Sequence, residues 1–323
     1  MASHSTPPSP SPARRRQRAA LRLGSVALGL AVGLGGLALL WPKPDRSLDT
    51  RQQLTAADLA KPPTRPVTLL VIGIDGERLG DAVNGAAPRG PANADALLLV
   101  RVNPNAPTQV LNLPPELAVQ LPGQSKPVAL GSLYRLGGAA LVGDAVRELV
   151  GLDAPQPDRY LVLSRSALRN LVDGLGGIEA NPPQAMRYRD RSQNFTIDLQ
   201  AGLQRLQGRE VEQLVRFRDP LRPQQSRIDD QQDVMRGLVR ALVLPVQLPN
   251  LPALVSRLRP QVSTNLSDTE TLGLLAAALS QGEAVQFKTV PLSPAKASHG
   301  ALRQLSPAAT LPLWPPAQPS SPP

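Results

Sequence analysis

Two aspartates stand at the ends of apolar runs, where acidic side chains could act on a phosphate. Asp75 comes directly after the run Val67–Ile74, and Asp95 comes directly before the apolar residues 96–102. If both runs are neighbouring strands, the two carboxylates converge at one edge of a sheet. Two such oxygen donors hold Mg²⁺, or Mn²⁺, beside a phosphate group. An aspartate at a strand end is also an ordinary turn residue, and this alternative stays open.

A group of arginines follows later in the chain. Arg216 and Arg218 flank Phe217 at the end of a predicted helix, and Arg227 stands at the start of the next one, followed by Gln231. Guanidinium groups fork onto phosphate oxygens, so these side chains could bind a diphosphate. Cations at a helix C-terminus are also favourable for the helix itself, which is the structural alternative.

The composition excludes several kinds of catalysis. The chain has no cysteine, and its two histidines, His4 and His299, lie near opposite ends. A thiol nucleophile, a cysteine-ligated metal, a Ser-His-Asp triad and a histidine metal site are therefore excluded. Lys and Arg exceed Asp and Glu by 35 to 25, but the arginines of residues 14–22 supply half of that excess. We therefore expect no nucleic-acid partner, and no helix-turn-helix pattern supports a transcription regulator.

The N-terminal segment predicts a membrane anchor. Residues 1–22 form a basic, disordered leader, and residues 23–41 carry no charge and end in Trp41. A run of about 20 uncharged residues can cross a bilayer as a helix, and the arginines keep its N-terminus in the cytoplasm. We therefore predict a single-pass protein of the bacterial cytoplasmic (inner) membrane with an extracytoplasmic C-terminal domain. A cleaved signal peptide and a buried soluble helix are the alternatives.

The rest of the chain alternates strands and helices after a proline-rich stalk at residues 42–66. The spacing predicts strands over residues 67–74, 96–102, 109–113, 160–163 and 284–292. It predicts helices over residues 137–149, 164–175, 209–217, 227–244 and 268–279, with a proline-bearing loop at 219–226 and a disordered proline-rich tail at 307–323. This order predicts an α/β (α+β) layered sandwich with a central mixed sheet flanked by helices, preceded by one transmembrane helix.

The order and spacing of several short motifs resemble one known family. They are Val71-Ile72-Gly73-Ile74-Asp75, Ala94-Asp95-Ala96, Leu113-Pro114-Pro115-Glu116, Leu175-Gly176-Gly177-Ile178, Leu206-Gln207-Gly208-Arg209-Glu210, Val215-Arg216-Phe217-Arg218 and Arg227-Ile228-Asp229-Asp230-Gln231-Gln232. The sequence resembles the LytR-CpsA-Psr family of extracytoplasmic glycopolymer transferases over residues 67–244, and residues 245–306 resemble the continuation of that domain.

The resemblance implies a transferase that moves a glycopolymer from a polyprenyl-diphosphate carrier to a cell-wall acceptor such as peptidoglycan. It places the metal, Mg²⁺ or Mn²⁺, on Asp75 and Asp95, and it gives Asp95 and the three arginines the catalytic roles. It places the diphosphate on Arg216, Arg218 and Arg227, beside Gln231. The apolar residues of the domain would then line a channel for the lipid tail, or form an ordinary core.

The sequence also departs from the family pattern. Asn93, Pro115 and Asp230 stand where the family has arginine. Each lost guanidinium removes charge stabilisation from a phosphate site. Replacement by Arg89, Arg101 or Arg222 is one account, and a different lipid-linked substrate is another. The third is an envelope protein that keeps the fold and binds lipid diphosphate, or scaffolds wall assembly, without turnover. Glu116 is available as a base by position only.

Overall fold

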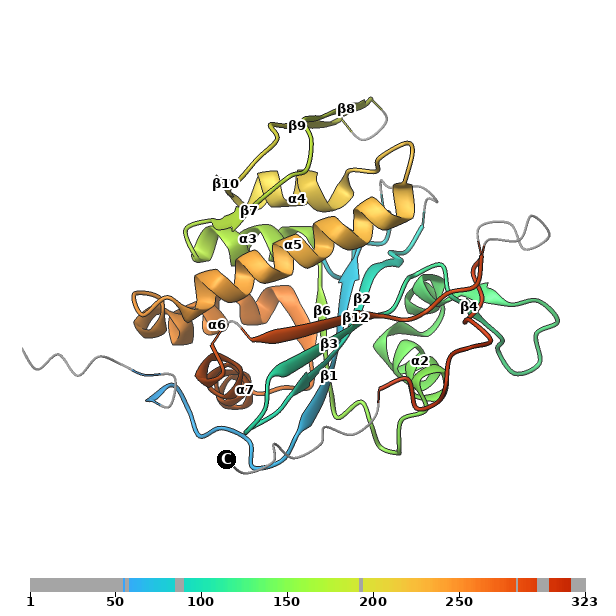
Figure 1. Cartoon of the computed structure of the whole chain (residues 1–323), viewed down its shortest axis with the longest axis horizontal. Helices are drawn as coiled ribbons and strands as arrows, with labels where there is room; N and C mark the ends of the chain where they lie inside the picture. The colour runs from blue at the N-terminus through green and yellow to red at the C-terminus, as the bar shows by residue number, and fades with distance from the viewer. Residues whose placement is uncertain are drawn as a thin grey trace, which may run out of the picture. The chain divides into compact units, whose positions relative to one another are not determined.

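A six-stranded mixed sheet forms the centre of the domain in the computed structural model, which describes residues 55, 58–84, 90–191, 194–282, 284–294 and 302–314 (Figure 1). Its strand order is β11-β6-β1-β2-β3-β12. β1 pairs antiparallel with β2 and parallel with β6, and β3 pairs parallel with β12. The strands are β1 (Val67–Ile74), β2 (Ala94–Val102), β3 (Thr108–Asn112), β6 (Arg159–Leu163), β11 (Val262–Thr264) and β12 (Val285–Thr289).

One face of the sheet packs against α2 (Leu133–Val150). The side chains of Leu70, Ile72 and Ile74 alternate along β1, and all three are buried on this side together with Val142 and Val146 of the helix. Successive strand residues point to opposite faces, so the intervening residues of β1 face the other way. Gly151 ends α2 with a left-handed backbone (φ 72°), which suits a glycine.

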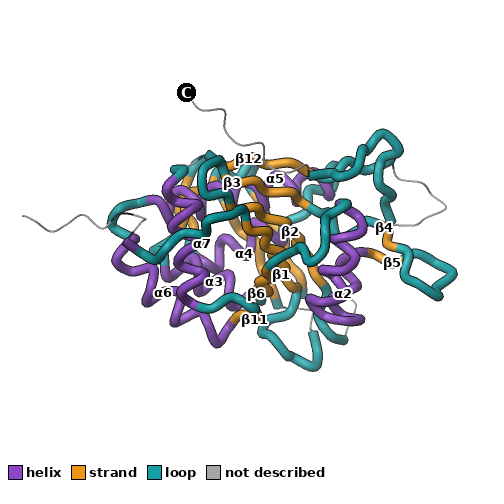
Figure 2. The backbone as a smooth tube through the Cα atoms, turned by 90° about the horizontal axis from the view of Figure 1, so that it is seen from below, coloured by secondary structure: helices purple, strands orange, loops and turns teal. Residues whose placement is uncertain are grey.

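The opposite face of the sheet is covered by the other helices, as Figure 2 shows for α3, α6 and α7. Val102 of β2 packs with Leu274 of α7 at one end of this face. A separate apolar cluster joins α3, α4, α5 and α6 to two small strand pairs, β7 with β10 and the hairpin β8 with β9. The bounds are α3 (Arg165–Gly174), β7 (Ile178–Ala180), β8 (Met186–Asp190), β9 (Phe195–Leu199), β10 (Gln204–Leu206), α4 (Gly208–Arg216), α5 (Pro223–Val243), α6 (Leu251–Leu258) and α7 (Asp268–Ser280).

The remaining elements are short. A two-stranded sheet pairs β4 with β5, and a 3₁₀ helix leads into α2. Two further 3₁₀ helices flank α6. Their bounds are β4 (Ala118–Val119), β5 (Val128–Ala129), η2 (Leu130–Ser132), η3 (Leu248–Asn250) and η4 (Arg259–Gln261).

The structure confirms the predicted mixed sheet flanked by helices. It also corrects two boundaries. The predicted loop at 219–226 is too long, because α5 begins at Pro223, and proline is well suited to the first turn of a helix. The helix predicted from Gly137 begins at Leu133 and bends at Gly137 and Gly138, whose backbone angles are not helical.

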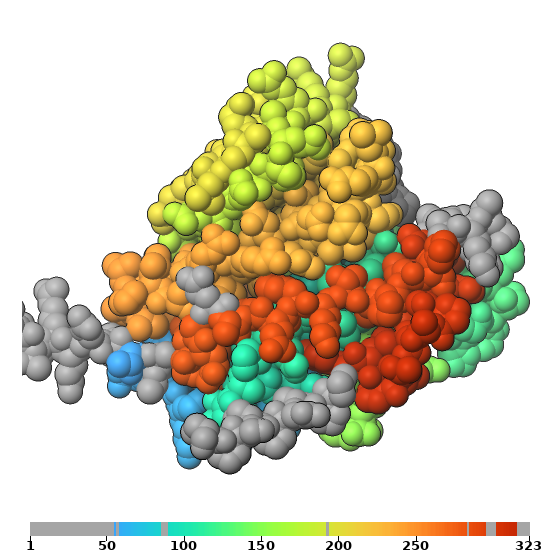
Figure 3. Space-filling model, in the orientation of Figure 1, coloured from blue at the N-terminus to red at the C-terminus, as the bar shows by residue number. Residues whose placement is uncertain are grey.

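The predicted disordered tail is wrong for residues 307–314. Trp314 is 2% exposed and belongs to the core beside α2. The guanidinium of Arg101 lies 4.2 Å from the centre of the Trp314 ring. It also donates a hydrogen bond to the backbone carbonyl oxygen of Trp314. The C-terminal residues, red in Figure 3, accordingly lie against the body of the domain.

The predicted membrane span at residues 23–41 and the leader before it lie outside the described residues. Among the helices that the structure does describe, none alone has the length and hydropathy of a membrane span. The segments Pro223–Val243 and Leu248–Gln261 meet those criteria only as a pair, across a bend of 96°.

Candidate active site

A cavity of about 660 Å³ lies between the sheet and the helices α3, α4 and α5. It combines charged groups with apolar walls. The charged or polar lining includes Asp75, Asp95, Arg165, Glu212, Arg216, Arg218 and Gln231. The apolar lining includes Val71 and Leu98 of the sheet and Leu168, Val215, Val234, Met235 and Leu238 of the helices. Such a cavity can take a ligand that has an ionic end and an apolar end.

The β1–β2 pair places both aspartates at this cavity. Gly73 pairs with Ala96 and Ile74 pairs with Ala94, so Asp95 is an extra residue in a β-bulge. A bulge turns a side chain away from the regular ladder, next to the end of β1, where Asp75 follows. The structure therefore brings Asp75 and Asp95 together, as their spacing predicts.

Asp75 is held by its neighbours. The backbone N–H of Asn93 donates a hydrogen bond of 2.8 Å to Oδ1 of Asp75. Burial raises the pKa of Asp75 above its ordinary value, the Asn93 hydrogen bond opposes this, and the like charge of Asp95 adds to it. A cation between the two carboxylates would relieve their repulsion.

These two carboxylates fit a magnesium site that also uses ligand oxygens. Mg²⁺ commonly keeps several waters and binds one or two carboxylates together with substrate phosphates. No group of three or more His, Cys, Asp or Glu residues suited to a metal occurs within the described ranges. The donor set of Asp75 and Asp95 therefore suits a metal that binds with a phosphate ligand.

The end of α4 delivers two of the predicted arginines to the cavity. Arg216 is the last helical residue, and its guanidinium lies 3.7 Å from the centre of the Phe195 ring. Arg218 donates hydrogen bonds of 2.9 Å to the carbonyl oxygens of Val215 and Phe217, which fixes its direction. Burial lowers the pKa of Arg218, and the charge of Arg227 acts in the same direction. Both groups lie where they could stabilise a diphosphate.

Arg227 is placed differently from the prediction. It lies in the second turn of α5, is 7% exposed, and pairs with Glu116 rather than lining the cavity. Gln231, one turn further along α5, does line the cavity, and its amide nitrogen lies 3.5 Å from the carbonyl oxygen of Asp95. The same turns contain Asp230, which is 2% exposed and whose Oδ2 has no hydrogen-bond partner among the described residues.

Arg165, which the sequence analysis missed, joins this site. It follows Ser164, which caps α3 by accepting a hydrogen bond from the N–H of Ala167. β6 runs parallel to β1, so both strands end at the same edge of the sheet, and Arg165 reaches the cavity near Asp75. The signal was available in the sequence: Arg165 follows a predicted strand just as Asp75 does.

Two of the three arginines named as replacements, Arg101 and Arg222, do not line this cavity. Arg101 is buried against Trp314, and Arg222 is exposed and 3.9 Å from Asp219. Arg89 lies outside the described residues. Among the described residues, Arg165 is an additional guanidinium at the cavity.

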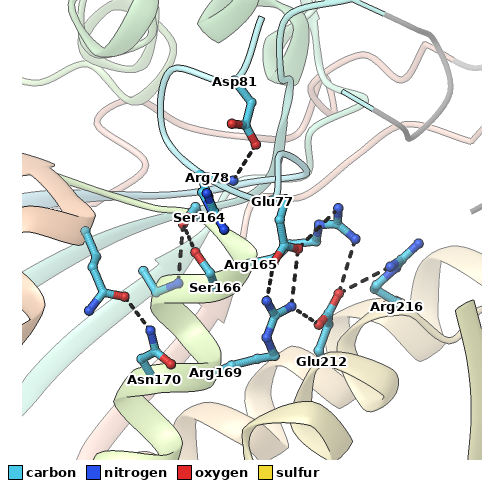
Figure 4. Close-up of polar contacts among 12 residues, drawn as sticks. Glu77, Arg78, Asp81, Ser164, Arg165, Ser166, Arg169, Asn170, Glu212 and Arg216 are labelled. Carbon is cyan, nitrogen blue, oxygen red and sulfur yellow. Dashed lines mark hydrogen bonds and ion pairs between the residues drawn. The ribbon is translucent and has the colours of Figure 1, made fainter. Parts of the chain in front are cut away.

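A buried carboxylate organises the guanidinium groups. Oε1 of Glu212 lies 3.2 Å from Nη1 of both Arg165 and Arg216, and its Oε2 accepts from Nη1 of Arg169. Figure 4 shows these side chains converging with Glu77, which also pairs with Arg165 and Arg169. Burial acts to raise the pKa of Glu77, but the hydrogen bond and charge of Arg169 lower it overall.

The sequence matches the family model described as "LytR_cpsA_psr family" over residues 44–308. A curated relative from Enterococcus faecalis, polyisoprenyl-teichoic acid–peptidoglycan teichoic acid transferase TagU, is 26% identical over 248 residues, which cover 75% of this chain and 76% of the relative. The regulatory protein MsrR of Staphylococcus aureus is 26% identical over 233 residues. That match covers 70% of this chain and 64% of MsrR, less than two thirds of its length.

The fold also matches solved structures. The crystal structure of Bacillus subtilis TagV superposes with a TM-score of 0.62 and 18% sequence identity. The match covers 76% of this chain and 92% of TagV. At this identity the likeness establishes the fold alone.

Proposed function

Because this chain belongs to the LytR_cpsA_psr family, we propose that it is a membrane-anchored, extracytoplasmic phosphotransferase. It moves a glycopolymer from a polyprenyl-diphosphate carrier to a cell-wall acceptor such as peptidoglycan. The name of its relative TagU, a polyisoprenyl-teichoic acid–peptidoglycan teichoic acid transferase, describes a transfer of this kind and supports the proposal. The uncharged run at residues 23–41 supports the anchor in the cytoplasmic membrane.

One observation carries this proposal: a single cavity is lined by the carboxylates of Asp75 and Asp95, by two further carboxylates, Asp190 and Glu212, and by three guanidinium groups, beside apolar walls. The three guanidinium groups are those of Arg165, Arg216 and Arg218. A polyprenyl-diphosphate glycan has the matching parts, because its diphosphate is anionic and its tail is a hydrocarbon.

In this proposal the acceptor hydroxyl attacks the phosphorus that bears the sugar. A new bond forms between the acceptor oxygen and that phosphorus, the bridging oxygen bond of the diphosphate breaks, and polyprenyl phosphate leaves. The guanidinium groups of Arg216 and Arg218 stabilise the charge on the attacked group and on the leaving phosphate. Arg218 needs little reorganisation, since the carbonyl oxygens of Val215 and Phe217 already hold it.

Asp75 and Asp95 are the residues that would hold Mg²⁺ or Mn²⁺. When bound, the metal would neutralise phosphate charge and act as a Lewis acid. Gln231 would contact the substrate beside Asp95. The acceptor proton leaves on the departing polyprenyl phosphate, which balances the step. Glu116 is unsuited as a base for it, because Glu116 is buried in its pair with Arg227 and does not line the cavity.

The second candidate is an envelope protein that binds lipid diphosphate without turnover. The pairing of Arg227 with Glu116 favours it, because one guanidinium expected at the diphosphate is engaged elsewhere. The residues Asn93, Pro115 and Asp230 supply no positive charge in its place. Both candidates require binding, and they differ only in the transfer step.

Release of polyprenyl phosphate tests the two candidates. The full chain in detergent micelles is incubated with Mg²⁺, a polyprenyl-diphosphate-linked glycan and peptidoglycan fragments. The proposed transferase releases polyprenyl phosphate and labels the acceptor, and Asp95→Asn and Arg218→Gln lose this activity. Arg257→Gln, an exposed arginine of α6 that lines no described cavity, serves as the control. Binding without release, in a folded sample, would leave the second candidate.

A further inference from the structure

A second cavity of about 420 Å³ adjoins the first. The two share a wall formed by Arg165, Phe195, Glu212 and Arg216. Glu77, Arg169 and Arg209 line only the second cavity. Apart from Phe195, every lining residue carries a charge, so this space suits a polar, ionic group and not a hydrocarbon chain.

The charges of the second cavity do not balance. Its lining contains four arginines and two glutamates, an excess of two positive charges. Glu212 is nearly enclosed, with its side chain 5% exposed, and three guanidinium groups surround it. A carboxylate held in this way fixes the arginines in place before any ligand arrives, which lowers the entropy cost of binding.

Two arginines of this cavity have N–H groups without a partner among the described residues. Nε of Arg165 is buried and has no acceptor in the described part of the chain. Arg209, exposed on the first turn of α4, makes no hydrogen bond or ion pair with a described residue. Because Nε of Arg165 is enclosed, an anionic ligand in the cavity would bond to the exposed N–H groups of Arg209 and be attracted by the charge of Arg165.

We propose that this second cavity is a subsite for an anionic group, a carboxylate or a phosphate, on the sugar nearest the diphosphate. The glycan that this protein accepts is therefore acidic at that sugar. The inference rests on the proposed function for the position of the diphosphate, beside Arg216 on the shared wall. Arg165 and Arg209 bind the anionic group, and Glu77 and Glu212 orient the guanidinium groups without contacting it.

The test compares three synthetic carriers on the full chain in detergent micelles. Each has the same short polyprenyl diphosphate, and its first sugar is glucose, glucuronate or 6-phosphoglucose. We expect the wild-type chain to bind both acidic carriers about tenfold more tightly than the neutral one. Equal affinity for all three carriers would overturn the subsite, and a preference for one acidic carrier would identify its anion.

Variants then locate the preference. Arg209→Gln removes an exposed side chain that has no partner among the described residues, so folding should stay intact. It should weaken acidic carriers about three- to fivefold and leave the neutral carrier unchanged. Arg165→Gln should weaken acidic carriers further, because Arg165 is the other arginine that binds the anionic group, and if this variant fails to fold, Arg209→Gln still decides the matter. Arg257→Gln is the control, because it is another exposed helical arginine, on α6.

The outcomes separate this subsite from the proposed transferase. Tighter binding of acidic carriers without release of polyprenyl phosphate would support the subsite and refute the transferase. Release of polyprenyl phosphate at equal rates from all three carriers would support the transferase and refute the subsite. If Arg209→Gln weakens binding to phosphatidylglycerol vesicles and leaves all carriers unaffected, the cavity contacts a lipid surface and the inference is wrong.

Discussion

Nη2 of Arg227 lies 2.5 Å from Oε2 of Glu116, and the two side chains are only 9% and 10% exposed. The pair ties α5 to the segment that follows β3. Arg227 was expected to bind the diphosphate, and Glu116 was available by position as a base. In this structure each is engaged by the other. Removing one partner of a buried pair leaves an uncompensated charge, so this contact is a structural tie between two parts of the domain.

Glu116→Gln should lower the free energy of unfolding by about 3 kcal/mol, because Arg227 would stay buried without its counter-ion. Urea unfolding of Glu116→Gln, Arg227→Gln and the double variant gives the coupling between the two residues. We expect the double variant to lose less than the sum of the two single losses. Glu148→Gln, an exposed position on α2, should change stability by less than about 0.5 kcal/mol. Additive losses would contradict the pairing.

Asp230 should make the protein less stable as the pH rises. Burial, with the like charge of Asp229, raises the pKa of Asp230 from 3.8 to about 7, and the like charges of Asp233 and Asp219 add to this while Arg218 opposes it. The folded state therefore keeps a proton that the unfolded state releases between about pH 4 and pH 7. This contribution to stability is complete below about pH 4 and is lost as the pH approaches 7.

Asp230→Asn removes this proton linkage. Above pH 7 the variant should exceed the wild-type chain in stability by on the order of 3 kcal/mol, and the difference should shrink towards pH 4. Urea unfolding at a series of pH values measures both slopes, with the exposed Asp153→Asn as the control. Parallel pH profiles for Asp230→Asn and the wild-type chain would show that Asp230 is ionised in the folded state.

Local patterns predicted the main strands and helices. β1 has the predicted bounds, since its alternating burial follows an unbroken apolar run that ends at Asp75. The hairpin of β8 and β9 was missed because residues such as Arg187, Tyr188 and Arg189 are exposed and give no apolar alternation. The packing of Trp314 was missed for another reason: its partner Arg101 is 213 residues away, and no local pattern reports that contact.

The sequence predicts the site residues that lie at the ends of strands and helices. It does not predict those whose position depends on tertiary contacts. Asp75 and Asp95 follow from the ends of two paired strands, and Arg216 follows from the end of α4. Arg227 shares the helix face of Gln231, but the segment carrying Glu116 covers it. The amphipathic pattern of α4 predicts that Glu212 is exposed. The packing of α3 against α4 buries it instead.

The approach of α4 to α3 depends on Gly208. A Cβ atom at this position would lie 2.3 Å from the carbonyl oxygen of Arg169, inside any allowed contact. Gly208→Ala should therefore destabilise the domain by about 2 kcal/mol. Gly143→Ala, in the interior of α2, is the matched control. Its Cβ would lie 4.0 Å from the side chain of Leu70, an ordinary contact, so alanine there should stabilise the domain by up to about 1 kcal/mol. Thermal unfolding measures both, and equal effects of the two substitutions would contradict the close approach.

The apolar wall of the first cavity should select for the lipid tail. Met235 of α5 lines this wall, so Met235→Trp fills part of the space without removing a charge. We expect about a tenfold loss of affinity for a long polyprenyl diphosphate and little change for a short prenyl diphosphate, since only the long chain needs the filled volume. Titration with both ligands checks this difference. Equal losses for the two chain lengths would place the tail elsewhere.

Magnesium and diphosphate should bind cooperatively at Asp75 and Asp95. Two carboxylates alone are a weak magnesium site, whereas two carboxylates with a diphosphate supply more oxygen ligands. By linkage, the diphosphate must raise the affinity for Mg²⁺ by the same factor as Mg²⁺ raises the affinity for the diphosphate.

Titration of the full chain with a short polyprenyl diphosphate, with Mg²⁺ or with EDTA, measures that factor, which we expect to be at least about tenfold. Asp75→Asn and Asp95→Asn should each reduce it towards one because the ion loses a ligand, while the exposed Asp153→Asn keeps it. An affinity for the diphosphate that EDTA leaves unchanged would show that the arginines alone bind it, and that the two aspartates serve the fold and not a metal.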